Sequence, residues 1–163
     1  MDDFTAACVG IEQLHARFVD ATFRQDGEQF AHCFAQDGVW QIAGMELVGR
    51  STILERISPM LGYCERIQLL AQTPMIELTN DGAQGRQQMV ELSKLKDGSG
   101  AMTIGVYHDR YVHEDGAWRY TKRHWTLKYR GPLDMSGLFP ATPDYGAFPA
   151  GPAADEATYV LKK

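Results

Sequence analysis

The chain has 163 residues, of which 44% are hydrophobic and 23% are charged, and it carries a formal net charge of -5. This length and composition suit one globular domain and exclude an intrinsically disordered chain. The acidic balance argues against a nucleic-acid partner, because phosphate binding requires clustered Lys and Arg.

No apolar run is long enough to span a bilayer, so no membrane association is expected. The N-terminal sequence MDDFTAACVG carries acids where a secretory signal is basic, which predicts a cytoplasmic protein. The cysteines, Cys8, Cys33 and Cys64, stand far apart and are expected to be reduced thiols. The histidines show no metal-ligand spacing, so no metal is expected.

An amphipathic helix is predicted near the N-terminus. Ile11, Leu14, Phe18 and Ala21 recur at helical spacing, which gives the helix one apolar face. Gly27 breaks this pattern and predicts the end of the helix.

Two short helices and a hairpin are expected next. Residues 28–34 are predicted to form a helix, and residues 39–48 are predicted to form a small hairpin. Thr52 and Glu55 have the spacing of a capping box, which predicts a third helix over residues 51–61.

The second half is predicted to form an antiparallel meander. Alternating runs span 66–78, 83–94, 101–113 and 117–129. Asp-Gly pairs stand between them, and such pairs indicate hairpins because Gly tolerates the positive φ of the turn. Pro74 lacks an amide proton, so it is expected at an edge or a bulge of the first run.

This order of elements predicts a single α+β domain over residues 1–132. A curved antiparallel sheet wrapped around the N-terminal helices would enclose a conical cavity, and small molecules tend to bind in such concave apolar places. Residues 133–163 are rich in Gly, Pro and Ala, and are predicted to form a C-terminal tail or lid.

The segment GVYHDRYVHEDGAWRYTKR, residues 105–123, predicts one wall of this pocket. Because side chains alternate along a strand, Tyr107 and Asp109 share a face, and Arg123 on the next strand is expected to join them. The same alternation places Trp118 and Tyr120 on the outer face, unless a bulge intervenes. An apolar outer face usually marks an interface, so a homodimer or homotrimer is expected.

Asp109 is the leading candidate for an acid-base or oxyanion-stabilising group. Burial would raise the pKa of its carboxyl, whereas an ion pair with Arg123 would lower it and keep the group charged. Two roles therefore stay open for Asp109, one catalytic and one as a structural ion pair between adjacent strands. Tyr107 is either a hydrogen-bond donor to a ligand or a cavity wall. His15 is a further candidate, with simple packing as the alternative.

Together these segments resemble the SnoaL-like branch of the nuclear transport factor two-like superfamily. The resemblance rests on IEQLHARFVDATFRQD, FAHCFAQDGVW, GRSTI, GVYHDRYVHEDGAWRYTKR and WTLKYRGPL. The closing segment is most similar to hexachlorocyclohexane dehydrochlorinase and scytalone dehydratase. The resemblance implies a cystatin-like α+β cone with no cofactor. It also implies a set of ligand-binding residues: His15, Phe18, Phe23, Trp40, Leu69, Trp125 and Leu127.

The chain departs from these enzymes at their catalytic positions. Phe23 and Leu69 stand where dehydratase-like members carry an Asp-His dyad, and an isomerase base would fall near Ile42. Reactions that depend on those groups are therefore not expected here by those routes.

Two functions follow from the sequence. The first is a cofactor-independent lyase, isomerase or cyclase that moves a proton on a small apolar, cyclic or aromatic ligand, with Asp109, Tyr107 and Arg123 as catalytic residues. The second is a non-catalytic module that binds a ligand or a partner, which the missing dyad favours. The small subunit of a ring-hydroxylating dioxygenase shares the fold, but its N-terminal pattern is not matched here.

Overall fold

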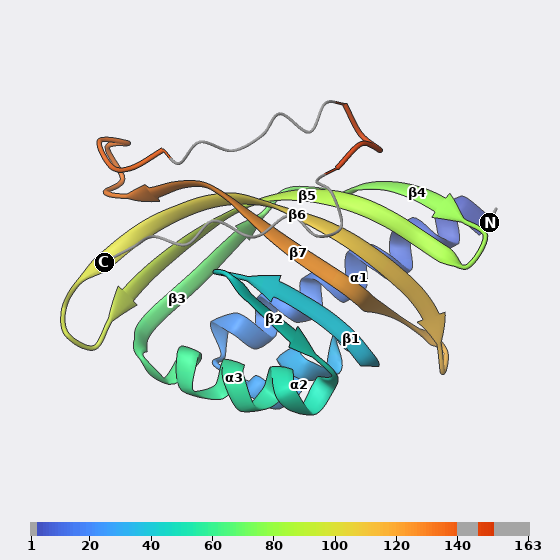
Figure 1. Cartoon of the computed structure of the whole chain (residues 1–163), viewed down its shortest axis with the longest axis horizontal. Coiled ribbons are helices and arrows are strands. Elements are labelled where there is room, and N and C mark those ends of the chain that lie inside the picture. Colours follow the sequence, from blue (N-terminus) through green and yellow to red (C-terminus); the bar gives the residue numbers. More distant parts are fainter. Residues whose placement is uncertain (1–2, 140–146, 152–163) are drawn as a thin grey trace.

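A curved seven-stranded sheet wraps around the three helices that the structure describes (Figure 1). The computed structural model describes residues 3–139 and 147–151. The helices are α1 (Asp3–Phe23), α2 (Gly27–His32) and α3 (Arg50–Gly62). The strands are β1 (Phe34–Ile42), β2 (Met45–Val48), β3 (Cys64–Ala71), β4 (Met75–Thr79), β5 (Gly82–Leu95), β6 (Gly100–Glu114) and β7 (Ala117–Gly131). The predicted α+β class is confirmed.

The strands lie in the order β2-β1-β7-β6-β5-β3, and β4 also pairs with β5. The hairpins β5-β6 and β6-β7 form as predicted, whereas β1 begins at Phe34 and runs parallel to β7. The first predicted run is divided at Pro74 into β3 and β4. Proline has no amide proton to give to a ladder, which accounts for the break.

Helix α1 packs its apolar stripe against the sheet. Ile11, Leu14, Phe18 and Ala21 are all at most 2% exposed. The helix ends at Phe23, earlier than predicted, and Asp26 then caps α2 by accepting a hydrogen bond from the Gln29 amide. No helix of the described chain is both long and apolar enough to span a membrane.

A β-bulge in β7 overturns the predicted positions of two aromatic side chains. Arg110 pairs with Lys122, but the next residue, Tyr111, pairs with Tyr120, so Thr121 is an extra residue. The bulge turns Tyr120 inward, where it is fully buried. Trp118, two residues before Tyr120, faces the same side of the strand. Its ring packs against Gly10 of α1, where no side chain stands in the way. These two side chains therefore give no support to the expected interface on the outer face.

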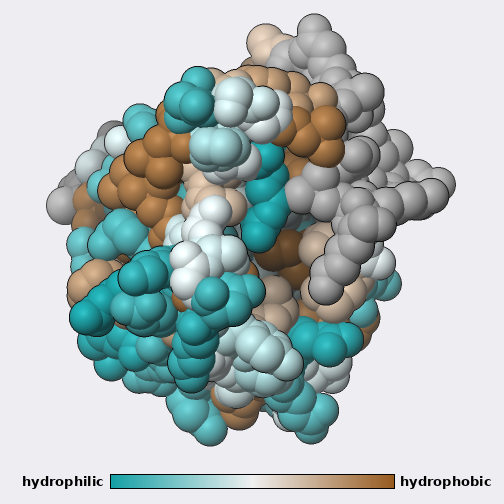
Figure 2. Space-filling model, turned by 90° about the vertical axis from the view of Figure 1, so that its left-hand side faces the viewer, coloured by the Kyte–Doolittle hydropathy of each residue, from teal (hydrophilic) through white to brown (hydrophobic). Residues whose placement is uncertain are grey.

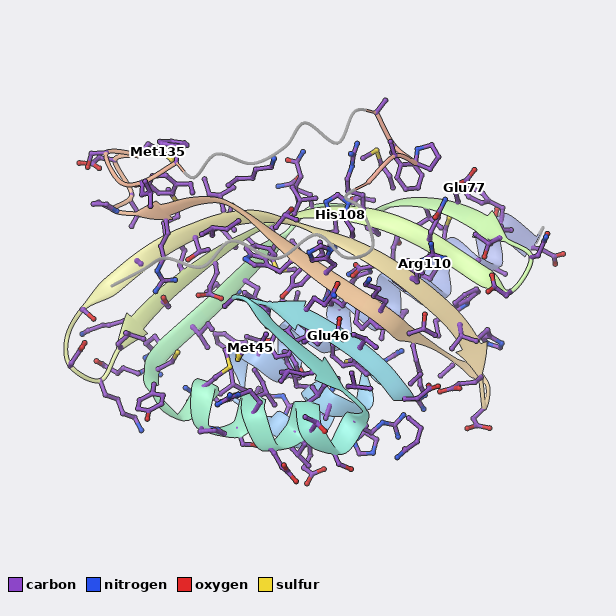
Figure 3. All side chains as sticks on the ribbon, viewed as in Figure 1. Met45, Glu46, Glu77, His108, Arg110 and Met135 are labelled. Atoms are coloured by element: carbon purple, nitrogen blue, oxygen red, sulfur yellow. The ribbon has the colours of Figure 1, made fainter. Side chains whose placement is uncertain are left out.

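The described part of the predicted tail lies against the outer face of the sheet, opposite the helices (Figure 1). Leu138 forms a bridge with Arg130, and Phe139 packs on Tyr129. The segment 147–151 borders a groove lined by His108, which lies on the outer side of β6 (Figure 3). Residues 140–146 and 152–163 of the predicted tail lie outside the described chain.

Candidate functional site

An apolar cavity of about 340 Å³ lies between the sheet and the helices. This volume falls in the range of small-molecule sites, roughly 300–1,000 Å³. A hollow with hydrophobic side chains at its base opens on one side of the molecule (Figure 2). Several residues singled out from the sequence line the cavity: Phe18, Trp40, Leu69, Tyr107, Trp125 and Leu127.

Trp40 offers this cavity a hydrogen-bond donor. Its side chain is 2% exposed, and its Nε1–H makes no hydrogen bond of ordinary geometry with the described residues, although it lies near enough to the Tyr107 hydroxyl to lower the pKa of that group. Buried polar groups are nearly always paired, so a ligand oxygen in the cavity can compete with the Tyr107 hydroxyl for this indole N–H.

The polar residues of the cavity include three that the sequence reasoning missed, namely Glu91, Thr103 and Arg130. Glu91 continues the inward alternation of Gln87 and Met89 along β5, and this signal was present in the sequence. Arg130 reaches the cavity because a second bulge, at Lys128, reverses the alternation of β7. The alternation of polar and apolar residues in the sequence does not reveal such a bulge, so it could not predict the position of Arg130.

Glu91 carries the one carboxyl group among the described residues that line the cavity. Burial raises its pKa, and the positive charge of Arg130 acts in the opposite direction. Arg130 itself donates from Nη1 to Thr103 Oγ1 at 3.0 Å. The cavity thus combines apolar walls with one carboxyl, one guanidinium and one indole N–H.

Asp109 and Arg123 lie together, but behind the cavity wall. Arg123 is fully buried and donates to Asp109 through Nε at 3.1 Å and through Nη2 at 3.2 Å. Its guanidinium carbon lies 4.2 Å from the ring centre of Phe18, 3.8 Å from that of Tyr107 and 4.2 Å from that of Tyr120. Because Phe18 and Tyr107 also line the cavity, they separate it from the ion pair.

The ion pair is held in its charged form at neutral pH. Burial raises the pKa of Asp109 to about 6, against the lowering effect of Arg123, so the carboxyl is ionised at pH 7. Asp109 in turn raises the pKa of Arg123, which is always protonated in any case. This geometry matches the structural alternative that the sequence left open for Asp109.

His15 belongs to the same buried network. Its Nδ1 lies 3.0 Å from the Tyr120 hydroxyl, and its Nε2 lies 2.9 Å from the Tyr111 hydroxyl. Tyr111 donates to Asp109 at 3.3 Å, so the tautomer with a proton on Nε2 satisfies both ring nitrogens. Burial, and then the charge of Arg123, lower the pKa of His15 well below its ordinary value. His15 is therefore neutral at pH 7.

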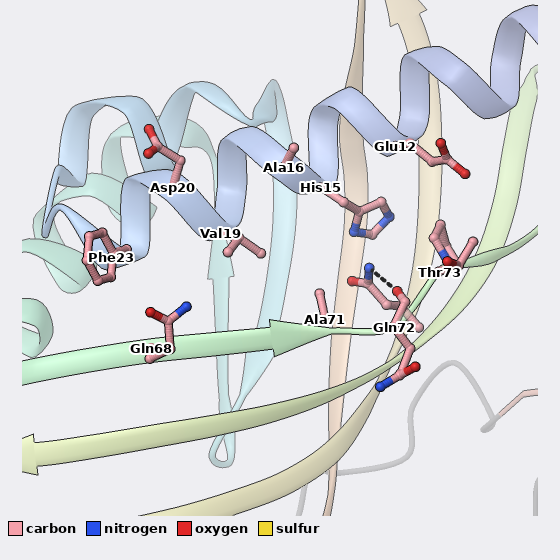
Figure 4. A pocket seen from close by; sticks show the side chains of 12 residues that line it. Glu12, His15, Ala16, Val19, Asp20, Phe23, Gln68, Ala71, Gln72 and Thr73 are labelled. Carbon is pink, nitrogen blue, oxygen red and sulfur yellow. Dashed lines mark hydrogen bonds between the residues drawn. The ribbon is translucent and has the colours of Figure 1, made fainter.

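His15 and Phe23 line a second, more open groove between α1 and β3 (Figure 4). Phe23 is 59% exposed there and does not line the cone cavity. Gln87 connects this groove to the buried ion pair. It accepts a hydrogen bond from Arg123 at 3.1 Å and donates one to the Gln72 carbonyl at 2.8 Å. Within the described chain, no group of three or more His, Cys, Asp and Glu could hold a metal.

The α+β cone with an internal cavity is also the fold of the solved structures that this chain resembles. The model of the SnoaL-like domain matches residues 5–124, and the chain belongs to this family. A search of curated proteins found no match.

Three solved structures illustrate the similarity. A function-unknown protein from Mycobacterium tuberculosis is 29% identical, with 73% of this chain and 70% of that chain covered and a TM-score of 0.67. A scytalone-dehydratase-like protein from Novosphingobium aromaticivorans is 16% identical, with 83% and 93% covered and a TM-score of 0.72. Hexachlorocyclohexane dehydrochlorinase from Novosphingobium barchaimii is 19% identical, with 86% and 98% covered and a TM-score of 0.72. At 16% and 19% identity, the last two similarities show a shared fold alone.

Replacing Asp109 by Asn is expected to destabilise the protein by about 3–5 kcal/mol, because it leaves the Arg123 charge buried without its partner. The measurement is the free energy of unfolding in urea at pH 7. Asp20→Asn is the matched control, since it breaks an exposed pair with Arg24 and should change stability by about 0–1 kcal/mol. An Asp109→Asn protein as stable as the parent would contradict the bracing role.

The pH dependence of stability should report the buried His15. Its pKa is lowered in the folded state, so below the ordinary value of 6.5 the unfolded chain binds more protons and stability is lost as the pH falls. At pH 5 this loss reaches at most about 2 kcal/mol relative to pH 7 for one such group. Between pH 7 and pH 5, His15→Gln should therefore lose less stability in urea unfolding than the parent does, because the opposite contribution of Asp109, whose pKa is raised to about 6, is present in both proteins. The exposed His113→Gln control should match the parent. An equal pH dependence of the unfolding free energy for the parent and His15→Gln would contradict the conclusion that His15 is buried in its neutral form.

Proposed function

We propose that the protein binds a small, apolar, cyclic molecule in the cone cavity. The observation that carries this proposal is an internal cavity of about 340 Å³ with aromatic and aliphatic walls, one of which presents the indole N–H of Trp40. Membership of the SnoaL-like family supports the same function. Trp40, Tyr107 and Trp125 suit a flat ring system, because aromatic side chains stack well on one another.

Binding should be measurable with indane, a small bicyclic hydrocarbon, as the probe. Two of the three tryptophans, Trp40 and Trp125, line the cavity, so indane should change the intrinsic fluorescence in a saturable way. Leu69→Phe places a larger side chain on the cavity wall and should weaken binding by about tenfold, or about 1.4 kcal/mol.

The control variant for this experiment is Leu70→Phe. Leu70 is the next residue of β3 and is 50% exposed, so its replacement should leave the dissociation constant unchanged. Saturable binding that Leu69→Phe does not weaken would place the probe elsewhere on the protein, and the absence of any binding would remove support for the proposal.

A second candidate function, cofactor-free proton transfer, is favoured by the position of Glu91. In this function a carboxylate removes a proton from carbon and returns it at another position, as in an isomerase or lyase. Glu91 lines the cavity, and its raised pKa brings it closer to the pH at which a general base works best. Asp109 is less suited, because the rings of Phe18 and Tyr107 lie between it and the cavity.

Exchange of the acidic C–H protons of 2-indanone in D₂O tests this second candidate. The Glu91 carboxylate would take a proton from the carbon beside the carbonyl and return a deuteron drawn from solvent. NMR should show exchange at least about tenfold faster with the parent than with Glu91→Gln, since general base catalysis contributes roughly 10²–10⁴-fold. The exposed Glu77→Gln is the control. Equal exchange by the parent and Glu91→Gln would contradict a catalytic role for Glu91.

A further inference from the structure

Three polar side chains form one row across the centre of the sheet. On β5 Glu91 pairs with Thr103 of β6, and Thr103 pairs with Arg130 of β7. Directly opposed residues have Cβ atoms roughly 4.5–5.5 Å apart, so the three side chains are neighbours on the same face. All three line the cone cavity, whose other walls are mainly apolar.

The presence of Arg130 in this row depends on the bulge at Lys128. Gly105 pairs with Leu127, whereas Ile104 pairs with Tyr129, so one residue of β7 is skipped. If the same sequence paired without a bulge, Lys128 would face outward and Tyr129 inward, and Arg130 would leave the cavity. The bulge therefore exchanges a tyrosine for a guanidinium on the cavity wall. Bulges often re-aim a side chain beside a functional site.

The charges of the row restrict what can bind against it. A ligand carboxylate would be attracted to Arg130 but would also approach Glu91, and a ligand amine would have the reverse problem. A guanidinium only donates hydrogen bonds and a carboxylate only accepts them. A hydroxyl group can satisfy both at once, because it has one O–H to donate and two lone pairs to accept with.

We infer that the ligand of the cone carries a hydroxyl group on its apolar ring system, bound between the Glu91 carboxylate and the Arg130 guanidinium. This inference rests on the proposed function, because it assumes that the cavity binds a ligand. Thr103 holds Arg130 in place through its 3.0 Å hydrogen bond and is a positioning residue. The apolar walls bind the ring body, and the row sets which functional group it carries.

The test compares four probes that share the indane ring: 2-indanol, 2-methoxyindane, 2-methylindane and indane-2-carboxylate. Their dissociation constants are measured with the full chain at pH 7 by calorimetry. The hydroxyl probe should bind about tenfold more tightly than the methyl probe, because a hydrogen bond to a charged group is stronger than one between neutral groups. The methoxy probe can only accept, so it should bind more weakly than the hydroxyl probe.

Variants of the three row residues then show which side chains cause the preference for the hydroxyl probe. Glu91→Gln and Arg130→Met should each reduce the advantage of 2-indanol over 2-methylindane to less than about threefold, with the affinity for 2-methylindane little changed. Thr103→Val provides an independent test if Arg130→Met does not fold, and it should also reduce the advantage. The matched controls are the exposed Glu77→Gln and Arg110→Met, which should retain it.

The outcomes separate this inference from the proposed function. If none of the four probes binds, the proposed function itself fails. If all bind with similar affinity, the cavity function stands and the hydroxyl preference is wrong. Tightest binding of the carboxylate would make Arg130 an anion site and overturn the inference. Equal binding of the methoxy and hydroxyl probes would remove the role of Glu91 as acceptor.

Discussion

The buried ion pair between Arg123 and Asp109 is the interaction on which the rest of the structure depends. A guanidinium without water must be neutralised and hydrogen-bonded, since an unpaired buried charge is strongly unfavourable. Three elements contribute to this around Arg123 of β7: Asp109 of β6 supplies the charge, Gln87 of β5 accepts a further hydrogen bond, and His15 of α1 orders the surrounding hydroxyls. The pair therefore joins the first helix to the three central strands.

The cavity takes its shape from the same interaction. Phe18 and Tyr107 contact the guanidinium with their rings and also line the cone. Side chains that are fixed on one side by a buried cation have little freedom to collapse into the empty space on the other. The ion pair thus acts as a support for the cavity, while the polar chemistry that a ligand meets comes from a different row of the sheet.

Much of the fold followed from local patterns, and two of the failures share one cause. The stripe Ile11, Leu14 and Phe18 predicted α1, and the Asp-Gly turns predicted the long hairpins, because both signals lie within a few residues. The orientation of Tyr120 was wrong and Arg130 was missed, because a bulge between each of them and Arg123 shifts the alternation by one residue. Such a bulge is fixed by tertiary packing, for instance the burial of Tyr120, and nothing in the alternating sequence marks it. Glu91, by contrast, followed a visible alternation and was overlooked.

The second bulge of β7 also bears on how this cavity could change during evolution. Loss of the single residue at position 128 would remove the bulge and leave Tyr129 opposite Ile104 and Arg130 opposite Thr103, so Arg130 would stay in the cavity. The hairpin, the helices and the buried ion pair all lie upstream of that point and would keep their places. A one-codon deletion there would thus conserve the polar cavity, because the register of β6 and β7 already leaves one residue of β7 unpaired at this point. At this point of the strand a deletion would therefore change recognition less than the replacement of Arg130 would.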